Sequence, residues 1–179
     1  MRIVNCEPTL RSERRGQTCL HYAEPRGGKD PEGGLIVNVL SMEIDERIVK
    51  FLKRHHVLTL ATATAEGEPW CANAFYAYDV ERNRLIFTSD DATRHAREMS
   101  SNCRVAASVV LETRIVGKVQ GLQISGVAGR GDEADRRVYI RRFPYAAALG
   151  ELHLWYVEPD MFKFTDNTLG FGKKLIWKS

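Results

Sequence analysis

Hydroxyl and basic side chains gather where a predicted strand ends and a short predicted helix begins. They are Thr88, Ser89, Thr93, Arg94 and His95. A helix start has unpaired backbone N–H groups and partial positive charge, and arginine adds a planar fork that matches phosphate oxygens. The segment therefore predicts either a phosphate site or only a capped helix with a solvated arginine. Asp90 and Asp91 are compatible with a phosphate only if they cap the chain or point away, because carboxylates repel it.

Two amide side chains in strand-like patterns are further candidates for ligand contacts. Asn73 lies between Pro69 and Tyr78, where both faces of the strand are largely apolar. We expect a core on one side of this strand and a ligand or partner chain on the other. Because a buried amide needs a hydrogen-bond partner, Asn73 contacts either a ligand or its own chain. Gln120 lies among glycines in a later strand region, and it either faces solvent or contacts the edge of a planar heterocycle.

The cysteines and histidines do not form a metal-binding pattern. The four cysteines have no Cys-x-x-Cys spacing, and the adjacent His55 and His56 are badly spaced for one helix face. No metal site is predicted, and nothing demands a disulfide. We also find no pattern typical of a protein acid, base or nucleophile, so catalytic residues stay unknown.

The elements that position these residues form a mainly β pattern with flanking helices. Helices are expected over 42–55, after Asp91 with Ala92, Ala96 and Met99 on one face, and over 132–143. Strands are expected over 57–64, 69–78, 84–88, 104–112, once or twice within 115–129, as a hairpin of 152–157 and 161–165, and within 169–177. Six or seven short strands with about three helices predict a small closed barrel.

Composition places the chain among ordinary globular proteins. It has 179 residues, 44% of them hydrophobic, and a net charge of +3, which permits an anionic ligand without indicating nucleic acid. It has no apolar run of membrane-spanning length and no signal-peptide core, so we predict a cytoplasmic protein without a membrane partner. Residues 1–41 are rich in Gly, Pro and Arg. They predict either a disordered extension or an upstream extension of the reading frame, before a domain over 42–179.

The order of these motifs resembles the FMN-binding split-barrel superfamily, which includes pyridoxamine 5′-phosphate oxidase. The resemblance rests on a strand, a Glu-Gly turn, a strand ending Phe-Thr-Ser, then Thr-Arg-His-x-x-x-Met and Asn-Cys-Arg-Val. Longer segments resemble the bacterial YhbP family more narrowly, and they are His55–Thr62, Pro69–Tyr76, Leu111–Thr113 and Phe164–Leu175. The resemblance runs from about residue 42 to the C-terminus.

This resemblance implies a homodimer with FMN at the subunit interface. It implies that the FMN phosphate is held by the strand-end and helix-start residues Thr88, Ser89, Thr93, Arg94 and His95. It further implies that Asn73 lies along the isoalloxazine ring and Gln120 near its polar edge. The chain departs from the family in having His95 in place of a lysine and Cys103 in place of a proline. It also lacks the C-terminal Trp and Arg pattern of pyridoxamine-phosphate oxidases, so that activity is not supported.

The resemblance implies two possible functions, and the basic residues suggest a third. The first is an FMN-binding flavoprotein acting as a small-molecule oxidase or reductase, because flavin supplies its own redox chemistry. The second is a non-catalytic protein that binds or stores flavin or haem in the same barrel. The third is a small nucleic-acid-binding barrel that uses the basic face from Arg136 to Arg142. It lacks the interleaved aromatic and basic surface expected of such a protein.

Overall fold

The computed structural model describes residues 43–148, 150–170 and 173–179. The chain divides into two units, Met1–Leu35 and Ile36–Ser179, and all described residues belong to the second. The prediction made for residues 1–41 lies outside the described residues.

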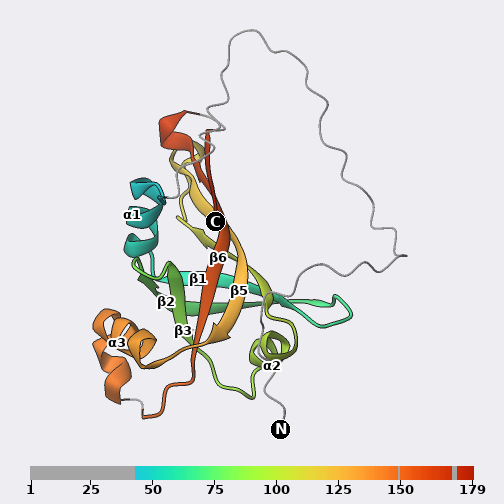
Figure 1. Ribbon diagram of the computed structural model, residues 1–179. Coiled ribbons are helices and arrows are strands. Elements are labelled where there is room, and N and C mark those ends of the chain that lie inside the picture. Colours follow the sequence, from blue (N-terminus) through green and yellow to red (C-terminus); the bar gives the residue numbers. More distant parts are fainter. Residues whose placement is uncertain (1–42, 149, 171–172) are drawn as a thin grey trace. The chain divides into compact units, whose positions relative to one another are not determined.

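Seven strands form one antiparallel sheet in the described residues, and six of them close into a barrel (Figure 1). The strands are β1 (Val57–Ala63), β2 (Pro69–Asp79), β3 (Arg84–Thr88), β4 (Arg104–Val110), β5 (Gln120–Arg130), β6 (Leu154–Asp166) and β7 (Lys174–Lys178). The order around the barrel is β3-β2-β1-β4-β5-β6, and β6 pairs with β3 to close it. β7 pairs with β6 along the edge that β3 leaves free. The predicted six- to seven-stranded split barrel is confirmed.

Alternation along the strands sends one apolar set of side chains into the barrel. In β1, Leu58 and Leu60 are buried, and in β4 the buried residues include Val105 and Val109. The ring of Phe162 comes from the opposite wall, on β6, and belongs to the same cluster. Each fully buried large apolar side chain contributes about 1.5–3 kcal/mol, so this cluster holds the strands together.

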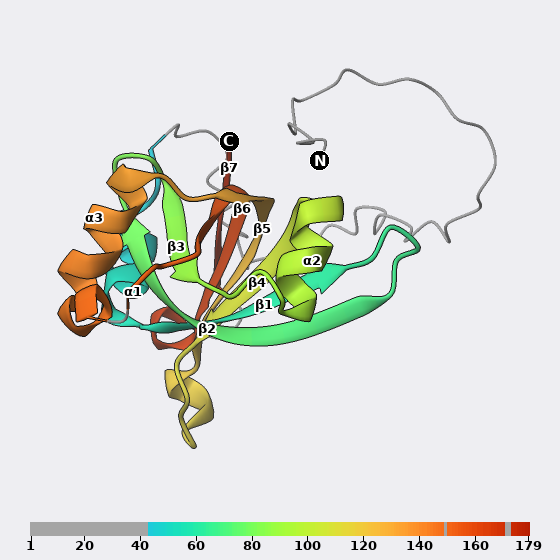
Figure 2. The same cartoon turned by 90° about the horizontal axis from the view of Figure 1, so that it is seen from below.

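Three α-helices flank the barrel in the part of the chain that the structure describes (Figure 2). They are α1 (Glu46–Arg54), α2 (Arg94–Ser101) and α3 (Glu133–Arg142), with short 3₁₀ helices at Val116–Lys118, Pro144–Ala148 and Asn167–Leu169. Asp45, Thr93 and Asp132 cap the three α-helices by accepting backbone N–H bonds. α1 and α2 contribute to the barrel core, while α3 packs with the outer face of β2, β3 and β6.

The predicted hairpin of 152–157 and 161–165 is wrong, because both halves belong to the single strand β6. Pro159 lacks an N–H, and the local pattern suggested a turn there. In the barrel, β6 pairs with β3 up to Val157 and with β7 from Met161, so Pro159 lies where that edge changes neighbour. On the other edge the register shifts at Gly126, where an added Cβ would lie 2.3 Å from the Glu158 carbonyl oxygen. A β-bulge at this glycine accommodates the close approach of the two backbones.

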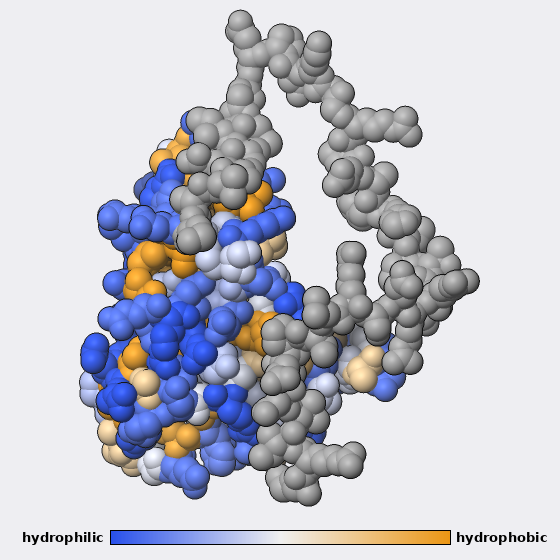
Figure 3. All heavy atoms as spheres, viewed as in Figure 1, coloured by the Kyte–Doolittle hydropathy of each residue, from blue (hydrophilic) through white to orange (hydrophobic). Residues whose placement is uncertain are grey.

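The outer side of β1, β2 and β4 carries apolar and amide side chains that the single chain leaves open. We call this set the open sheet face, and it comprises Val57, Thr59, Asn73, Phe75, Ser108 and Val110. Val57, Phe75 and Val110 are 44%, 52% and 63% exposed. One side of β2 packs on the barrel core, as expected from the sequence. The other side of its first half is exposed to solvent in the single chain. Over the described residues seen in Figure 3, hydrophobic patches likewise lie between hydrophilic ones.

Candidate phosphate and cofactor site

The end of β3 and the start of α2 bring three of the predicted residues into one hydrogen-bonded cluster. The Ser89 side-chain oxygen lies 2.6 Å from Nε2 of His95 and 2.9 Å from Oγ1 of Thr93. Ser89 is 8% exposed, and its N–H donates to the carbonyl of His153 at 3.0 Å. Thr88 donates its hydroxyl to the same carbonyl at 3.3 Å. Pairing of β3 with β6 therefore fixes the position of both hydroxyls.

The first turn of α2 leaves backbone donors open beside this cluster. Thr93 is the N-cap, and its Oγ1 accepts from the N–H of Ala96 at 3.3 Å. Among the described residues, none accepts from the N–H groups of Arg94 and His95. Two free N–H groups at the positive end of an eight-residue helix, next to three hydroxyls, are suited to an anion such as phosphate.

His95 is a neutral member of the cluster. Burial lowers the pKa of its imidazole below the usual value, because the charged form loses hydration. The ring thus contributes hydrogen bonding to Ser89 near pH 7. This agrees with the departure noted from the sequence, where a histidine stands in place of a second cationic lysine.

Arg94 is held in place from two sides. Its Nε donates to Oε1 of Glu98 at 2.7 Å, and its guanidinium lies 4.6 Å from the ring centre of Trp70. Glu98 is buried, and its other oxygen accepts from the Thr62 hydroxyl at 2.5 Å. Hydrogen bonds from Thr62 and Arg94 lower the pKa of Glu98, so the carboxylate stays charged. With Nε engaged, the two terminal nitrogens of Arg94 remain for a ligand, and Nη2 also lies 4.0 Å from the exposed carboxylate of Glu68.

Asp90 and Asp91 meet the condition that the sequence placed on them. Oδ1 of Asp90 accepts from the N–H of Ala92 at 2.7 Å within the turn that precedes α2. Asp91 forms an ion pair with Arg130, which lowers the pKa of its carboxyl, and lies 3.4 Å from Nδ1 of His153. Both carboxylates are thus engaged locally.

Asn73 lies outside this cluster, on the open sheet face. Its Oδ1 accepts from the Thr59 hydroxyl at 2.8 Å across the β1–β2 pair, so the predicted internal hydrogen bond is present. The residue is exposed, and it lies three positions along β2 from Trp70, which corresponds to roughly 10 Å of strand. A ligand contact of Asn73 stays a prediction.

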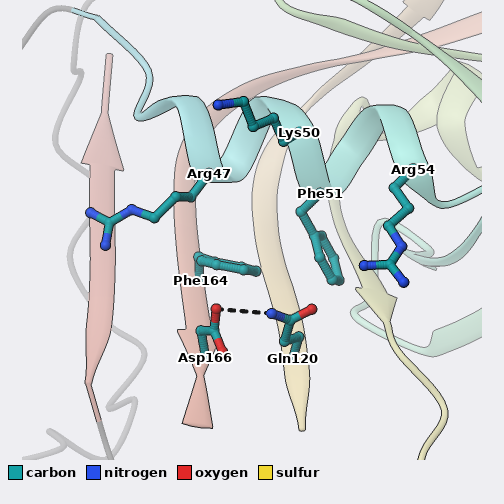
Figure 4. Close-up of a pocket in the computed structure, with 7 residues that line it drawn as sticks. All are labelled: Arg47, Lys50, Phe51, Arg54, Gln120, Phe164 and Asp166. Carbon is teal, nitrogen blue, oxygen red and sulfur yellow. Dashed lines mark hydrogen bonds between the residues drawn. The ribbon is translucent and has the colours of Figure 1, made fainter. Parts of the chain in front are cut away.

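Gln120 lies in a different place, beneath α1. Its Nε2 donates to Oδ2 of Asp166 at 2.9 Å (Figure 4). Arg130, at the other end of β5, pairs with Asp91, and the ten steps of strand between Gln120 and Arg130 span roughly 33 Å. Within one chain, Gln120 is therefore remote from the α2 cluster. It lines what we call the basic hollow, whose walls are Arg47, Lys50, Phe51, Arg54, Gln120, Phe164 and Asp166.

Sequence reasoning missed four residues that shape the α2 cluster, namely Trp70, Glu98, Arg130 and His153. Only Glu98 had a local signal, because it follows Arg94 by four residues on the same helix. The other three reach the site through strand pairing. No group of three or more potential metal ligands occurs among the described residues. In the same part of the chain, no helix is long and apolar enough to cross a membrane.

Comparison with known sequences identifies the family. The family described as pyridoxamine 5′-phosphate oxidase matches residues 44–166. A UPF0306 protein of Enterobacter sp. (strain 638) is 45% identical over 140 residues, which cover 76% of this chain and 97% of that protein. The UPF0306 protein YhbP of Escherichia coli O157:H7 is 42% identical over 140 residues, covering 76% of this chain and 94% of that protein.

Solved structures with the same fold are far less similar in sequence. A haem-binding protein from Mycobacterium smegmatis matches with a TM-score of 0.58 and 20% identity, over 69% of this chain and 52% of that one. HutZ, the haem storage protein from Vibrio cholerae, matches with a TM-score of 0.53 and 21% identity, over 66% of this chain and 91% of that one. Sequence and fold agree, and the chain belongs to the UPF0306 (YhbP) family of pyridoxamine 5′-phosphate oxidase-like split barrels.

Proposed function

We propose that this protein binds FMN, with the phosphate at the start of α2. The observation that carries the proposal is the α2 cluster itself. Two open N–H groups, the hydroxyls of Thr88, Ser89 and Thr93, and an arginine fixed by Glu98 converge there. A dianionic phosphate matches this set, since the N–H groups of Arg94 and His95 are open donors and the guanidinium is a cation.

In this proposal each residue of the cluster has a stated task. Arg94 pairs with phosphate oxygens through its terminal nitrogens, because Glu98 and Trp70 already fix its other groups. Ser89 donates its hydroxyl to the phosphate, and His95 orients Ser89 through Nε2. The hydroxyls of Thr88 and Thr93 donate to the carbonyls of His153 and Asp90 and so shape the site around the phosphate. Bound FMN would supply hydride and electron transfer, which is why the site needs no acid or base of its own.

A homodimer is part of the same proposal. The open sheet face leaves Val57, Phe75 and Val110 exposed in one chain, and a second copy would bury them. Asn73 lies on this face, which supports the expectation that it borders the isoalloxazine ring. Gln120 stays a separate prediction, since roughly 33 Å of β5 lies between it and Arg130 at the α2 end.

The first test is the absorbance spectrum of the freshly purified protein, followed by FMN titration. We expect flavin bands and one FMN per chain in a dimer. Arg94→Ala should weaken FMN binding by about 10- to 100-fold, the effect of one charge-assisted contact, with the elution volume of the dimer unchanged. Arg137→Ala, an exposed arginine on α3, is the matched control. Unchanged FMN affinity in Arg94→Ala would reject the site.

Redox turnover is a further part of the proposal with its own test. FMN-loaded protein is mixed with NADH or NADPH without oxygen, and bleaching of the flavin band is followed. Bleaching that reverses on adding oxygen supports an oxidoreductase. Absence of bleaching with either donor would favour a non-catalytic flavin carrier.

Haem binding without catalysis is the second candidate. Solved proteins described as haem-binding and as a haem storage protein share the fold, although at 20–21% identity that likeness concerns the fold alone. A Soret band in the purified protein, and no response to FMN, would favour this candidate over the first.

We do not propose nucleic-acid binding. Two arginines of the basic face of α3 have structural partners. Arg142 donates to the carbonyl of Lys53 at 2.8 Å and lies 2.7 Å from Nδ1 of His56, while Arg136 lies 3.8 Å from Glu133. Two of the four arginines of this face therefore serve contacts within the chain.

A further inference from the structure

The three hydroxyl groups at the start of α2 differ in where their protons go. Thr88 donates its hydroxyl to the carbonyl of His153 at 3.3 Å. Thr93 donates its hydroxyl to the carbonyl of Asp90 at 2.7 Å, and Ser89 lies farther from that same carbonyl, at 3.4 Å. Because each hydroxyl has a single proton, Ser89 is the one that can donate to a phosphate.

The proton of Ser89 is shared with His95. Oγ of Ser89 lies 2.6 Å from Nε2 of His95, so one hydrogen bond joins the two atoms. Either Ser89 donates to a bare Nε2, or a protonated Nε2 donates to Oγ. In the first arrangement the single hydroxyl proton is used up. Donation from Ser89 to a phosphate therefore requires a proton on Nε2 of His95.

The cationic form of the imidazole ring always meets this requirement. A neutral ring has its proton on either Nε2 or Nδ1, whereas the imidazolium has a proton on both nitrogens. The two contacts given for the ring, to Ser89 and at 3.3 Å to Thr93, both involve Nε2. In the described ranges no residue bonds to Nδ1, so the chain does not select the tautomer. Protonation of the ring is then the change that commits Ser89 to a phosphate.

Several segments contribute charged or titratable groups around His95. They are Arg94, Arg97 and Glu98 on α2, Asp90 and Asp91 before it, Glu68 in the β1–β2 hairpin, Arg130 on β5 and His153 before β6. Burial lowers the pKa of His95, and the charge of Glu98 raises it by less. Without a ligand, the ring is therefore neutral near pH 7.

A bound phosphate changes this balance. A phosphate oxygen that accepts from Ser89 lies roughly 2.7 Å from Oγ, which brings it within roughly 5 Å of Nε2 of His95. A phosphate monoester carries nearly two negative charges above about pH 6. Negative charge at this distance favours the imidazolium over the neutral ring. The phosphate and the proton on His95 therefore stabilise each other.

From these hydrogen bonds we infer that His95 is a specificity-determining residue, which takes up a proton when phosphate binds and so matches the second negative charge of a phosphate monoester. The inference rests on the proposed FMN site and specifies the charge of the ligand that this site selects. Since binding then includes uptake of a proton, the affinity for FMN should rise as the pH falls through neutrality. A flavin without a phosphate should show no such dependence.

The test is titration of the full-length protein with FMN between pH 8.0 and 6.5, followed by flavin fluorescence. Affinity should rise roughly three- to tenfold over this range, in which the phosphate remains largely dianionic. Riboflavin lacks the phosphate and is the matched control ligand, so its affinity should stay constant. Calorimetry at pH 7.0 in two buffers of different ionisation enthalpy should show net proton uptake with FMN and none with riboflavin.

Variants assign this proton to His95. His95→Gln keeps an amide N–H for Ser89 but cannot become charged, so the proton uptake and the rise in affinity should both disappear. His95→Lys carries a fixed charge and should bind FMN without dependence on pH. His153→Gln removes the other histidine beside α2 and should keep the proton uptake. The urea midpoint and the riboflavin affinity report whether each variant is folded.

The outcomes separate this inference from the proposed function. FMN affinity that is constant between pH 8.0 and 6.5 would overturn the inference and leave the FMN site standing. Proton uptake that survives in His95→Gln, or that is lost in His153→Gln, would also overturn it. Absence of FMN binding at every pH would instead reject the proposed function, and the inference with it.

Discussion

Two ion pairs with the same helical spacing lie in opposite environments. On α2, Arg94 precedes Glu98 by four residues with an N···O distance of 2.7 Å, and the Glu98 side chain is 6% exposed. On α1, Glu46 precedes Lys50 by four residues at 2.5 Å, but both side chains are more than 70% exposed. Spacing and distance make the pairs look alike. Burial decides their roles, because water and salt screen the exposed pair.

The same contrast extends to the surfaces around the two helices. At α2, Thr62 and Trp70 hold the charged groups so that a fixed set of donors faces outward. At α1, the Glu46–Lys50 pair lies in solvent, and the residues around it include both cations and the Asp166 carboxylate. The arrangement at α2 suits a compact, highly charged phosphate, whereas the charges at α1 are of both signs.

The largest effect should come from breaking the buried pair. Glu98→Ala leaves the Thr62 hydroxyl, itself buried, without its acceptor, and the free energy of unfolding should fall by about 2 kcal/mol. This is less than the roughly 3–5 kcal/mol expected for breaking a fully buried pair, because Arg94 is 40% exposed and regains water. Urea unfolding measures the change.

Glu98→Gln is the control for this variant. It keeps an acceptor for Thr62 and nearly the same volume, so most of the stability should return while the charge that orients Arg94 is lost. If Glu98→Ala costs less than about 0.5 kcal/mol, the α2 pair behaves like a surface pair and the comparison fails.

The second-largest effect should be a dependence of the free energy of unfolding on pH, caused by His95 in the α2 cluster. Because burial lowers the folded pKa of His95 below 6.5, the unfolded chain takes up its proton at a higher pH than the folded one. The stability that the folded protein gains from keeping His95 neutral is therefore complete above about pH 6.5. It is lost as the pH falls toward the folded pKa of His95.

This pH effect is measured by urea unfolding between pH 7.5 and 5.5. One proton limits the slope to about 1.4 kcal/mol per pH unit. His55 also has a pKa lowered by burial, so the slope of the wild type must be compared with that of His95→Asn. Equal slopes would show that His95 does not titrate in this range.

Local patterns were sufficient for most elements of the barrel. The strand predicted over 84–88 has those bounds in the structure, because Leu85, Ile86 and Phe87 are all buried. The stripe of Ala92, Ala96 and Met99 predicted a helix after Asp91. In the structure α2 buries Ala96 and Met99, but it begins at Arg94 after the cap Thr93, and Ala92 lies in the preceding turn. In each case the residues of one element are enough to predict it, through their hydrophobic periodicity or through a helix cap.

Features that depend on distant pairing could not be predicted in the same way. The continuity of β6 through Pro159 requires knowing that β3 ends and β7 begins at that edge. The separation of Gln120 from the α2 cluster follows from the direction of β5, not from its composition. Trp70 reaches Arg94 only because the β1–β2 hairpin brings it to α2. Such contacts join residues that are far apart in the sequence, and local sequence patterns do not predict them.

The smallest effect should come from Glu46→Gln on α1. Since the Glu46 and Lys50 side chains are highly exposed, the urea midpoint should not move measurably, in contrast to Glu98→Ala. A loss of stability like that of Glu98→Ala would mean that spacing rather than burial governs these pairs.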